Sequence, residues 1–406
     1  MRRPLGLLCL LLCLLLVACD GAAPTPPVPT TSVEPEPPAP IGDAARGRAL
    51  LVRFECSRCH AGAGPPGAAE RDCVGCHRDV RAGRVEAPPE ILAGWRASLH
   101  SLPDAPDLAG ASRLDPAWIA EYLQRPVDLR PHLDATMPRL PLDARDARDL
   151  ASALAPPRAP SVTGGDPARG REAVAARPCG QCHTLGGEPL PTRGAAGVGG
   201  ERFARARRLA PDLAFAAARM PATLVDWLVD PASLHPRTEM PPTDLSAAEA
   251  RDVAAYLRAS TEIDVRRPLP PRLPLLSREV TWEEVDAALF HDTCWHCHSD
   301  PGYAIGDGGP GNTGGLGFEG RGLDLASYEA LRSGALFEGR RRSVFREVTL
   351  PGGETLPLVV ASLRARQLEE AGLPSGDVLG MPLGLPSVSP GAIQLLETWI
   401  AQGRRR

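Results

Sequence analysis

Four copies of the pattern Cys-x-x-Cys-His constrain this chain of 406 residues more than any other feature of its sequence. They occupy residues 56–60, 73–77, 179–183 and 294–298. Two thiols at this spacing can form thioether bonds with the vinyl groups of a porphyrin, and the adjacent imidazole can reach the iron. The sequence therefore predicts four covalently attached c-type haems. The attachment cysteines are Cys56, Cys59, Cys73, Cys76, Cys179, Cys182, Cys294 and Cys297, and the proximal iron ligands are His60, His77, His183 and His298.

The other three of the eleven cysteines, Cys9, Cys13 and Cys19, lie close to the N-terminus. The rest of the chain therefore keeps no cysteine for a disulfide or a catalytic thiol. One alternative is a zinc site that combines the cysteine pairs at 56/59 and 73/76. Both pairs are followed by a histidine that a zinc ribbon does not need, so haem attachment is the favoured interpretation.

The N-terminal segment has the order of a secretory signal, because Arg2 and Arg3 precede a leucine-rich run over residues 5–18. That run is too short to cross a bilayer. It ends in Leu-Val-Ala-Cys at 16–19, which resembles a bacterial lipobox; the resemblance implies cleavage after residue 18 and lipidation of Cys19. The alternative is an ordinary signal peptide with an incidental cysteine. We therefore expect a lipoprotein signal peptide over 1–18 and a bacterial periplasmic protein held by lipid to the inner membrane, or else to the outer membrane.

Proline-rich stretches divide the remainder. Residues 19–42 are crowded with Pro, Thr and Ala and are typical of an extended tether. Two further breaks, at 157–165 and at about 263–280, leave a first segment (43–156), a second segment (166–262) and a third segment (281–406). We expect these segments to be three domains, the first with two haems and the others with one each.

The first two segments repeat one plan. Gly-Asp-Ala-Ala-Arg-Gly-Arg at 42–48 corresponds to Gly-Asp-Pro-Ala-Arg-Gly-Arg at 165–171, and both segments later contain Ala-Pro-Asp-Leu, a helical stretch, Met-Pro and a final helix. The first segment is longer between its motif histidine and Ala-Pro-Asp-Leu, and the additional residues carry the motif at 73–77. The third segment has helix-start patterns at Thr281, with Glu284, and at Ser389-Pro390. The whole pattern predicts an all-α chain.

This order of helix, haem motif, irregular loop, helix, Met-Pro and terminal helix resembles the class I cytochrome c fold. The resemblance implies three consecutive domains of that kind, the first carrying an additional haem-binding insertion. It also implies that the carbonyl groups of Pro106 and Pro211 orient proximal imidazoles. In the same way it implies a methionine as sixth iron ligand for the haems of His60, His183 and His298, respectively Met137, Met240 and Met381.

Two departures accompany this resemblance. The terminal helix of the first segment has Ala153 where the second has Tyr256, so the aromatic contact between terminal helices is either absent or supplied by Phe54. Met220 also precedes a proline but lies before the helix that follows Ala-Pro-Asp-Leu, so we expect it to pack in the core.

The haem of His77 has no methionine of its own. His100 follows this motif and is our expected sixth ligand for that haem; His132 and an open coordination site are the alternatives. We expect a surface role for His235. His296 lies inside the last motif, where its ring should point away from the iron of that motif.

Composition and ligation together suggest the class of function. The net charge of −4, without a basic stripe, gives no support to a nucleic-acid partner. His/Met ligation raises reduction potential, and six-coordinate irons leave no position for a substrate. We therefore expect an electron carrier that serves other redox proteins, with no small-molecule substrate. The alternative is the haem subunit of an oxidoreductase, or a peroxidase-like enzyme whose His77 haem is five-coordinate.

Overall fold

The computed structural model describes residues 42–65, 72–97, 99, 102–134, 136–158, 164–193, 200–260, 267–299, 312 and 314–406. Contacts divide the chain into Met1–Pro40, which lies outside the described residues, and Ile41–Arg406. The expected signal peptide, most of the expected tether and Cys19 therefore also lie outside them. Within the described residues no helix is long and apolar enough to cross a membrane.

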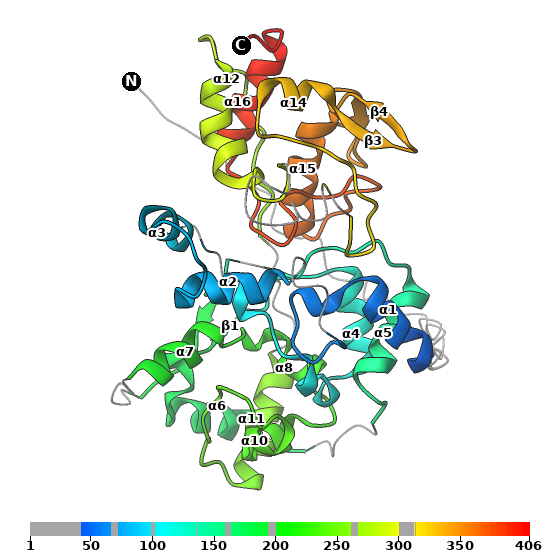
Figure 1. The fold of residues 1–406 in the computed structure, drawn as a ribbon. Helices are drawn as coiled ribbons and strands as arrows, with labels where there is room; N and C mark the ends of the chain where they lie inside the picture. The colour runs from blue at the N-terminus through cyan, green and yellow to red at the C-terminus, as the bar shows by residue number, and fades with distance from the viewer. Residues whose placement is uncertain are drawn as a thin grey trace, which may run out of the picture. The chain divides into compact units, whose positions relative to one another are not determined.

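The first segment is built from helices and short 3₁₀ turns (Figure 1). Its terminal helices, α1 and α5, pack against each other, and α4 packs on α5. The additional motif forms α2, which is followed by α3. The element bounds are α1 Ala44–Arg53, η1 Cys56–Arg58, α2 Cys73–Ala82, α3 Pro89–Ala97, η3 Leu102–Asp104, η4 Leu108–Arg113, α4 Pro116–Gln124 and α5 Ala144–Leu154.

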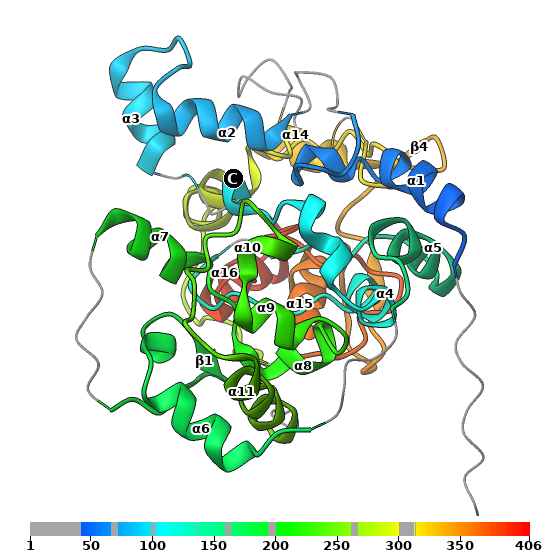
Figure 2. The same ribbon diagram turned by 90° about the horizontal axis from the view of Figure 1, so that it is seen from below.

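The second segment repeats this plan, with α6 packed against α11 (Figure 2). It adds one short antiparallel pair, in which Thr184 lies opposite Pro189. The element bounds are α6 Pro167–Ala175, η5 Pro178–Gln181, β1 Thr184–Leu185, β2 Glu188–Pro189, α7 Glu201–Leu209, η6 Leu213–Phe215, α8 Ala216–Arg219, α9 Leu224–Val229, α10 Pro231–Leu234 and α11 Ala247–Ala259.

The terminal helices of these two segments cross at glycines. A Cβ atom on Gly47 would overlap the carbonyl oxygen of Asp149, and one on Gly170 would overlap that of Asp252. Side chains of the same two aspartates also hold the helix starts, since Asp149 accepts the N–H of Asp43 at 2.6 Å and Asp252 that of Asp166 at 2.6 Å. The repeat read from the sequence is therefore present in three dimensions.

The neighbours of these glycines confirm that Ala153 and Tyr256 are equivalent, because their Cβ atoms lie beside Gly47 and Gly170 respectively. Phe54 is fully buried in the core of the first segment, where Ala153 packs against the same cluster. The alternative in which Phe54 supplies the aromatic contact is thus the one that the structure favours.

The third segment starts at Thr281, whose side chain and Glu284 form the predicted capping box. Its core surrounds Trp282, Phe290 and Trp399. Two hairpins, β3–β4 and β5–β6, depart from the expected all-α fold, although the chain as a whole is rich in helix. The element bounds are α12 Trp282–Val285, η7 (a π-helix) Asp286–Cys294, α14 Tyr328–Ser333, β3 Ala335–Phe337, β4 Arg340–Arg342, β5 Glu347–Thr349, β6 Thr355–Pro357, α15 Leu358–Glu370 and α16 Pro390–Ala401.

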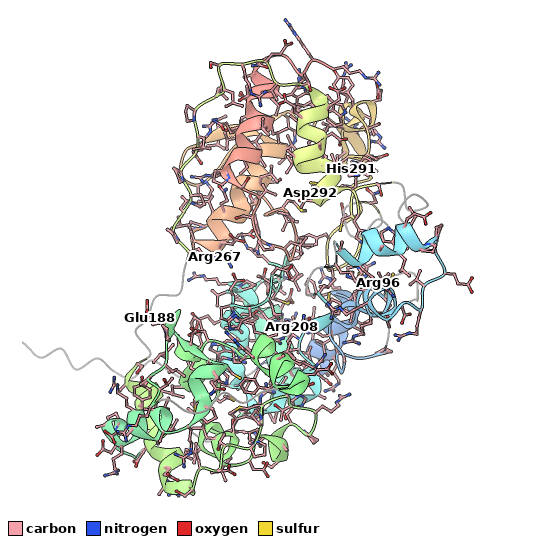
Figure 3. The ribbon with its side chains drawn as sticks, turned by 90° about the vertical axis from the view of Figure 1, so that its left-hand side faces the viewer. Arg96, Glu188, Arg208, Arg267, His291 and Asp292 are labelled. Atoms are coloured by element: carbon pink, nitrogen blue, oxygen red, sulfur yellow. The ribbon has the colours of Figure 1, made fainter. Side chains whose placement is uncertain are left out.

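The three segments contact one another within Ile41–Arg406. Arg208 on α7 pairs with buried Asp104 of the first segment, with Nη1 and Oδ2 2.8 Å apart (Figure 3). Arg267, which precedes the third segment, pairs with Asp128 at 2.6 Å (Figure 3). Leu316 from the third segment packs against the core of the first.

Candidate haem-binding sites

Three of the four motifs adopt the same turn. In each, the backbone N–H of the histidine donates to the carbonyl of the first cysteine: His60 to Cys56 at 2.9 Å, His183 to Cys179 at 3.0 Å and His298 to Cys294 at 3.0 Å. The motif at 73–77 instead forms the start of α2, capped by Asp72, which accepts the N–H of Gly75 at 2.8 Å. Residues three and four apart share one helix face, so both arrangements present two thiols and one imidazole together.

Two proximal imidazoles are oriented as predicted. Nδ1 of His60 lies 2.8 Å from the carbonyl oxygen of Pro106, and Nδ1 of His183 lies 2.7 Å from that of Pro211. A protonated Nδ1 that donates to a carbonyl leaves Nε2 as the nitrogen that can bind iron. Burial lowers the pKa of both histidines, which keeps the rings in the neutral form that metals require.

The third segment supplies a leucine at the corresponding position. Gly-Leu-Asp-Leu at 322–325 takes the place of Ala-Pro-Asp-Leu, and Asp324 accepts the N–H of Ala326 at 2.8 Å as Asp212 accepts that of Ala214 at 2.8 Å. Burial lowers the pKa of His298 to about 4, and the carbonyl of Leu323 partly offsets this effect. Leu323 thus takes the sequence position of Pro106 and Pro211, but the buried Nδ1 of His298 makes no hydrogen bond among the described residues. The shared Asp-Leu pair was the signal for this position in the sequence.

Each predicted methionine ligand packs against the same core cluster as a cysteine of its motif. Met137 packs against the core cluster that also contacts Cys56, and Met240 against the one that contacts Cys179. Met381 packs against the cluster that contacts Cys294. Met220 is a buried member of the second core, as predicted.

One cavity of about 720 Å³ joins the first and second segments. Its wall includes His60 and Met137 from the first and His183 and Met240 from the second. A volume of this size is typical of sites that enclose a small organic molecule or cofactor. Two predicted haem sites therefore share one continuous space.

Arginines line this cavity, among them Arg113, Arg130 and Arg219. Burial, together with repulsion from Arg130, lowers the pKa of Arg113 and of Arg219 to about 10. The Nε–H groups of Arg113 and Arg219 are buried and donate a hydrogen bond to no partner among the described residues. Buried cations need anions, and carboxylates are their usual partners. A haem carries two propionate carboxylates, so these residues fit that group.

The motif at 73–77 lies beside two other motifs. Burial, together with the neighbouring Cys73, raises the pKa of the Cys59 thiol to about 12. On the other side, the ring centre of His77 lies 5.8 Å from that of His296 in the third segment, with the ring planes at 48°. Sequence reasoning missed this second contact.

The remaining candidate histidines are distributed as follows. His100 lies outside the described residues. His132 is exposed. His235 was expected at the surface, but it is half-buried and lines the shared cavity, where burial lowers its pKa.

The zinc alternative gains no support, because no group of three or more His, Cys, Asp or Glu side chains among the described residues could hold a metal ion. The haem interpretation requires no such group, since the porphyrin supplies four iron ligands.

Comparison with known proteins agrees with this geometry. A family model described as Cytochrome c matches residues 167–261. No curated protein and no solved structure matches the chain. The match covers the segment in which His183, Pro211 and Met240 surround the shared cavity. Residues 167–261 therefore form a cytochrome c domain, which implies covalently bound haem and supports a role in electron transfer.

Proposed function

We propose that this chain is a tetrahaem c-type cytochrome that transfers single electrons on the periplasmic side of the inner membrane, within a respiratory or dehydrogenase chain. Its partners are redox proteins on either side of that chain. Its anchor is a lipid on Cys19, and residues 20–42 tether the haem-bearing part to the membrane.

The observation that carries this proposal is the repetition of one binding geometry. His60 with Pro106 reproduces His183 with Pro211 to within 0.1 Å in the nitrogen-to-oxygen distance. The first segment thus has the same histidine–proline contact as the cytochrome c domain. Asp324 and Leu323 extend the pattern to the third segment, and the motif on α2 adds the fourth attachment site.

Haem, when bound, supplies an iron that changes its charge by one electron. The residues of the chain fix its position and tune that change. The cysteines hold it covalently, while Pro106 and Pro211 hold the proximal rings in place. Met137 and Met240 line the same cavity and would each supply a soft thioether as the sixth ligand, which raises the reduction potential of the iron. Arg113 and Arg219 offset carboxylate charge inside the cavity.

The shared cavity also bears on electron exchange. Because residues of two motifs line it, the haems that these motifs attach would lie close together, and an electron could pass directly between the two segments. Sites that are filled with six ligands do not bind a substrate at the iron. This arrangement favours a carrier over a catalyst.

The test is to purify the exported protein and count its haems by mass spectrometry. We expect four covalent additions, with a ferric spectrum that is low-spin throughout. A matched variant, Cys179→Ser with Cys182→Ser, should lose one addition and keep three. Fewer than four additions in the unmodified protein would overturn the proposal, and so would a ferric haem that binds cyanide or peroxide rapidly.

A further inference from the structure

We propose that His296 is the sixth iron ligand of the haem attached at 73–77, so that one bis-histidine site is built from the first and third segments. This inference rests on the proposed function for the presence of that haem. The assignment replaces His100 of the first segment, the ligand expected from the sequence, with His296 of the third segment.

The separation of the two rings fits an iron between them. A metal-to-imidazole nitrogen bond is about 2 Å long, and with ~1.1 Å from that nitrogen to its ring centre, two imidazoles on one iron have centres about 6 Å apart. The observed distance between the ring centres of His77 and His296 is 5.8 Å. Their ring planes are inclined by 48°, as axial ligands that rotate independently about their own bonds allow.

The residues around His296 turn its ring away from the site of its own motif. Trp295 packs against the core of the third segment and donates its indole N–H to the carbonyl of Leu325 at 3.0 Å. His298 is buried, and its ring lies near the backbone of Leu323. His296 is exposed, in contrast, and its ring meets that of His77. One motif therefore directs one histidine inward and another toward the first segment.

On the opposite side, α2 holds His77 firmly. Asp72 caps the start of this helix and Gly83 ends it with a left-handed conformation. Arg78 donates to the carbonyl of Pro103 at 3.3 Å, and Arg96 from α3 donates to that of Val80 at 3.0 Å. A rigid helix fixes the direction in which the proximal imidazole and the two thiols point.

Other described side chains compete poorly for this position. The chain has five methionines, of which Met137, Met240 and Met381 lie beside other motifs and Met220 is buried in the second core. His132 is exposed. His291 stacks on Trp295, with ring centres 3.8 Å apart.

The assignment also orders the four haems. Cys59 neighbours Cys73, and His296 lies between Cys294 and Cys297. The haem of His183 shares a cavity with that of His60, which adjoins the haem of His77, which in turn is ligated from within the motif of His298. Two imidazoles give a lower potential than His/Met ligation, so the site between the first and third segments is the low-potential station of the series.

The experiment compares the full-length holoprotein with its His296→Ala variant by ferric electron paramagnetic resonance and redox titration. We expect one of four haems to lose its bis-histidine low-spin signal and to become high-spin, while the other three keep their signals and potentials. Added imidazole should restore the low-spin signal. His296→Met should retain a low-spin haem at a raised potential, which keeps the test valid if the alanine variant matures poorly.

His291→Ala is the matched control, because His291 flanks the same motif and should leave all four spectra unchanged. Four low-spin haems in His296→Ala would overturn the assignment, as would a new high-spin signal in His100→Ala alone. Absence of haem from the 73–77 motif in the unmodified protein, read by mass spectrometry of its peptides, would instead overturn the proposed function and this assignment with it.

Discussion

The guanidinium carbon of Arg113 lies 4.8 Å from the ring centre of Trp227, so a cation from the first segment covers an indole from the second. The second segment reciprocates with Arg219, which lies 5.2 Å from the ring centre of Trp118. Two hydrogen bonds also cross between the segments: Thr223 Oγ1 donates to the carbonyl of Arg113 at 2.6 Å, and the N–H of Asp115 donates to the carbonyl of Arg219 at 2.7 Å. Each half of the shared cavity is thus completed by the other.

Replacing Arg219 by glutamine should lower the potential of at least one haem in the shared cavity. Loss of a positive charge favours the ferric over the ferrous iron. A unit charge about 10 Å away is worth roughly 1–2 kcal/mol at an effective dielectric constant of 20, or on the order of 50–80 mV for one electron. Redox titration measures this shift. Arg193→Gln removes an exposed partner of Glu172 and should shift nothing; equal shifts in both variants would contradict a propionate role for Arg219.

Met240→His should lower the potential of one haem and leave three unchanged, because a second imidazole replaces a thioether at one iron. The measurement is a redox titration combined with magnetic circular dichroism, which reports the ligand type. Met220→Leu is the control, since Met220 is buried but is assigned to packing. Movement of all four potentials together, or of none, would show that the assignment of one methionine to one haem is wrong.

Gly170→Ala should destabilise the second segment strongly. The added methyl group would overlap the carbonyl oxygen of Asp252, and backbone atoms at a helix crossing cannot move aside cheaply. Overpacking of this kind costs about 1–3 kcal/mol or more. Thermal unfolding followed by circular dichroism gives the loss. Gly391→Ala, near the start of α16, would bring the new Cβ no closer than 3.9 Å to Oγ of Ser389 and should keep the unfolding temperature. An unchanged temperature for Gly170→Ala would argue against the tight crossing.

Asp212→Asn should lower stability at neutral pH and lose its effect in acid. Burial alone would raise the pKa of Asp212, but bonds from Thr184, Gly187, Ala214 and Gly186 outweigh it and hold the pKa below its usual range. A depressed carboxylate pKa stabilises the fold above about pH 4, and this contribution disappears as the pH falls through the folded value.

The expected difference at neutral pH is about 2 kcal/mol, as for hydrogen bonds to a charged group. Denaturant unfolding at several pH values from 7 to 3 measures it. Glu188→Gln, an exposed site in β2, serves as the control. A difference that stays constant down to pH 3 would mean that the charge of Asp212 does not contribute.

Cys19→Ala should release the protein from membranes, because the lipid that the lipobox implies can no longer be attached. Fractionation of cells into membrane and soluble periplasmic material measures the change. Cys13→Ala alters a cysteine inside the leucine-rich run and should leave membrane association intact. Continued association of Cys19→Ala would place the attachment on a partner protein.

Local patterns predicted what depends on neighbouring residues. The capping box at Thr281 and the carbonyl partners of His60 and His183 all involve short motifs at fixed spacing. The repeat at 42–48 and 165–171 indicated that two segments share one helix crossing, because each carries its glycine at the same position.

The turn of the hairpin β3–β4 had a local sequence signal, but the charged residues of its second strand gave no strand pattern. Glu338 and Gly339 both have positive φ, as a two-residue hairpin turn requires, and Gly339 follows an apolar strand. The partner strand consists of Arg340, Arg341 and Arg342, all exposed, so no alternation of polar and apolar residues marks it.

Long-range contacts left no signal of either kind. His77 and His296 lie in different segments, and neither periodicity nor spacing relates them. The same holds for Arg113 and Trp227, since a cavity formed between two repeats depends on how they dock. Local sequence determines the structure around each residue of such a pair, but it does not indicate that the two residues are in contact.

Docking through Arg113 and Arg219 has a consequence for how this chain can be divided. Cleavage between residues 156 and 166, followed by separation of the halves, would expose the apolar lining of the shared cavity to water. Arg113 and Arg219 would each lose the tryptophan ring that they contact. A protein that contained either half alone would have only one wall of the shared cavity. The two repeats must accordingly fold and remain together as one unit, and they cannot act as two independent domains on a linker.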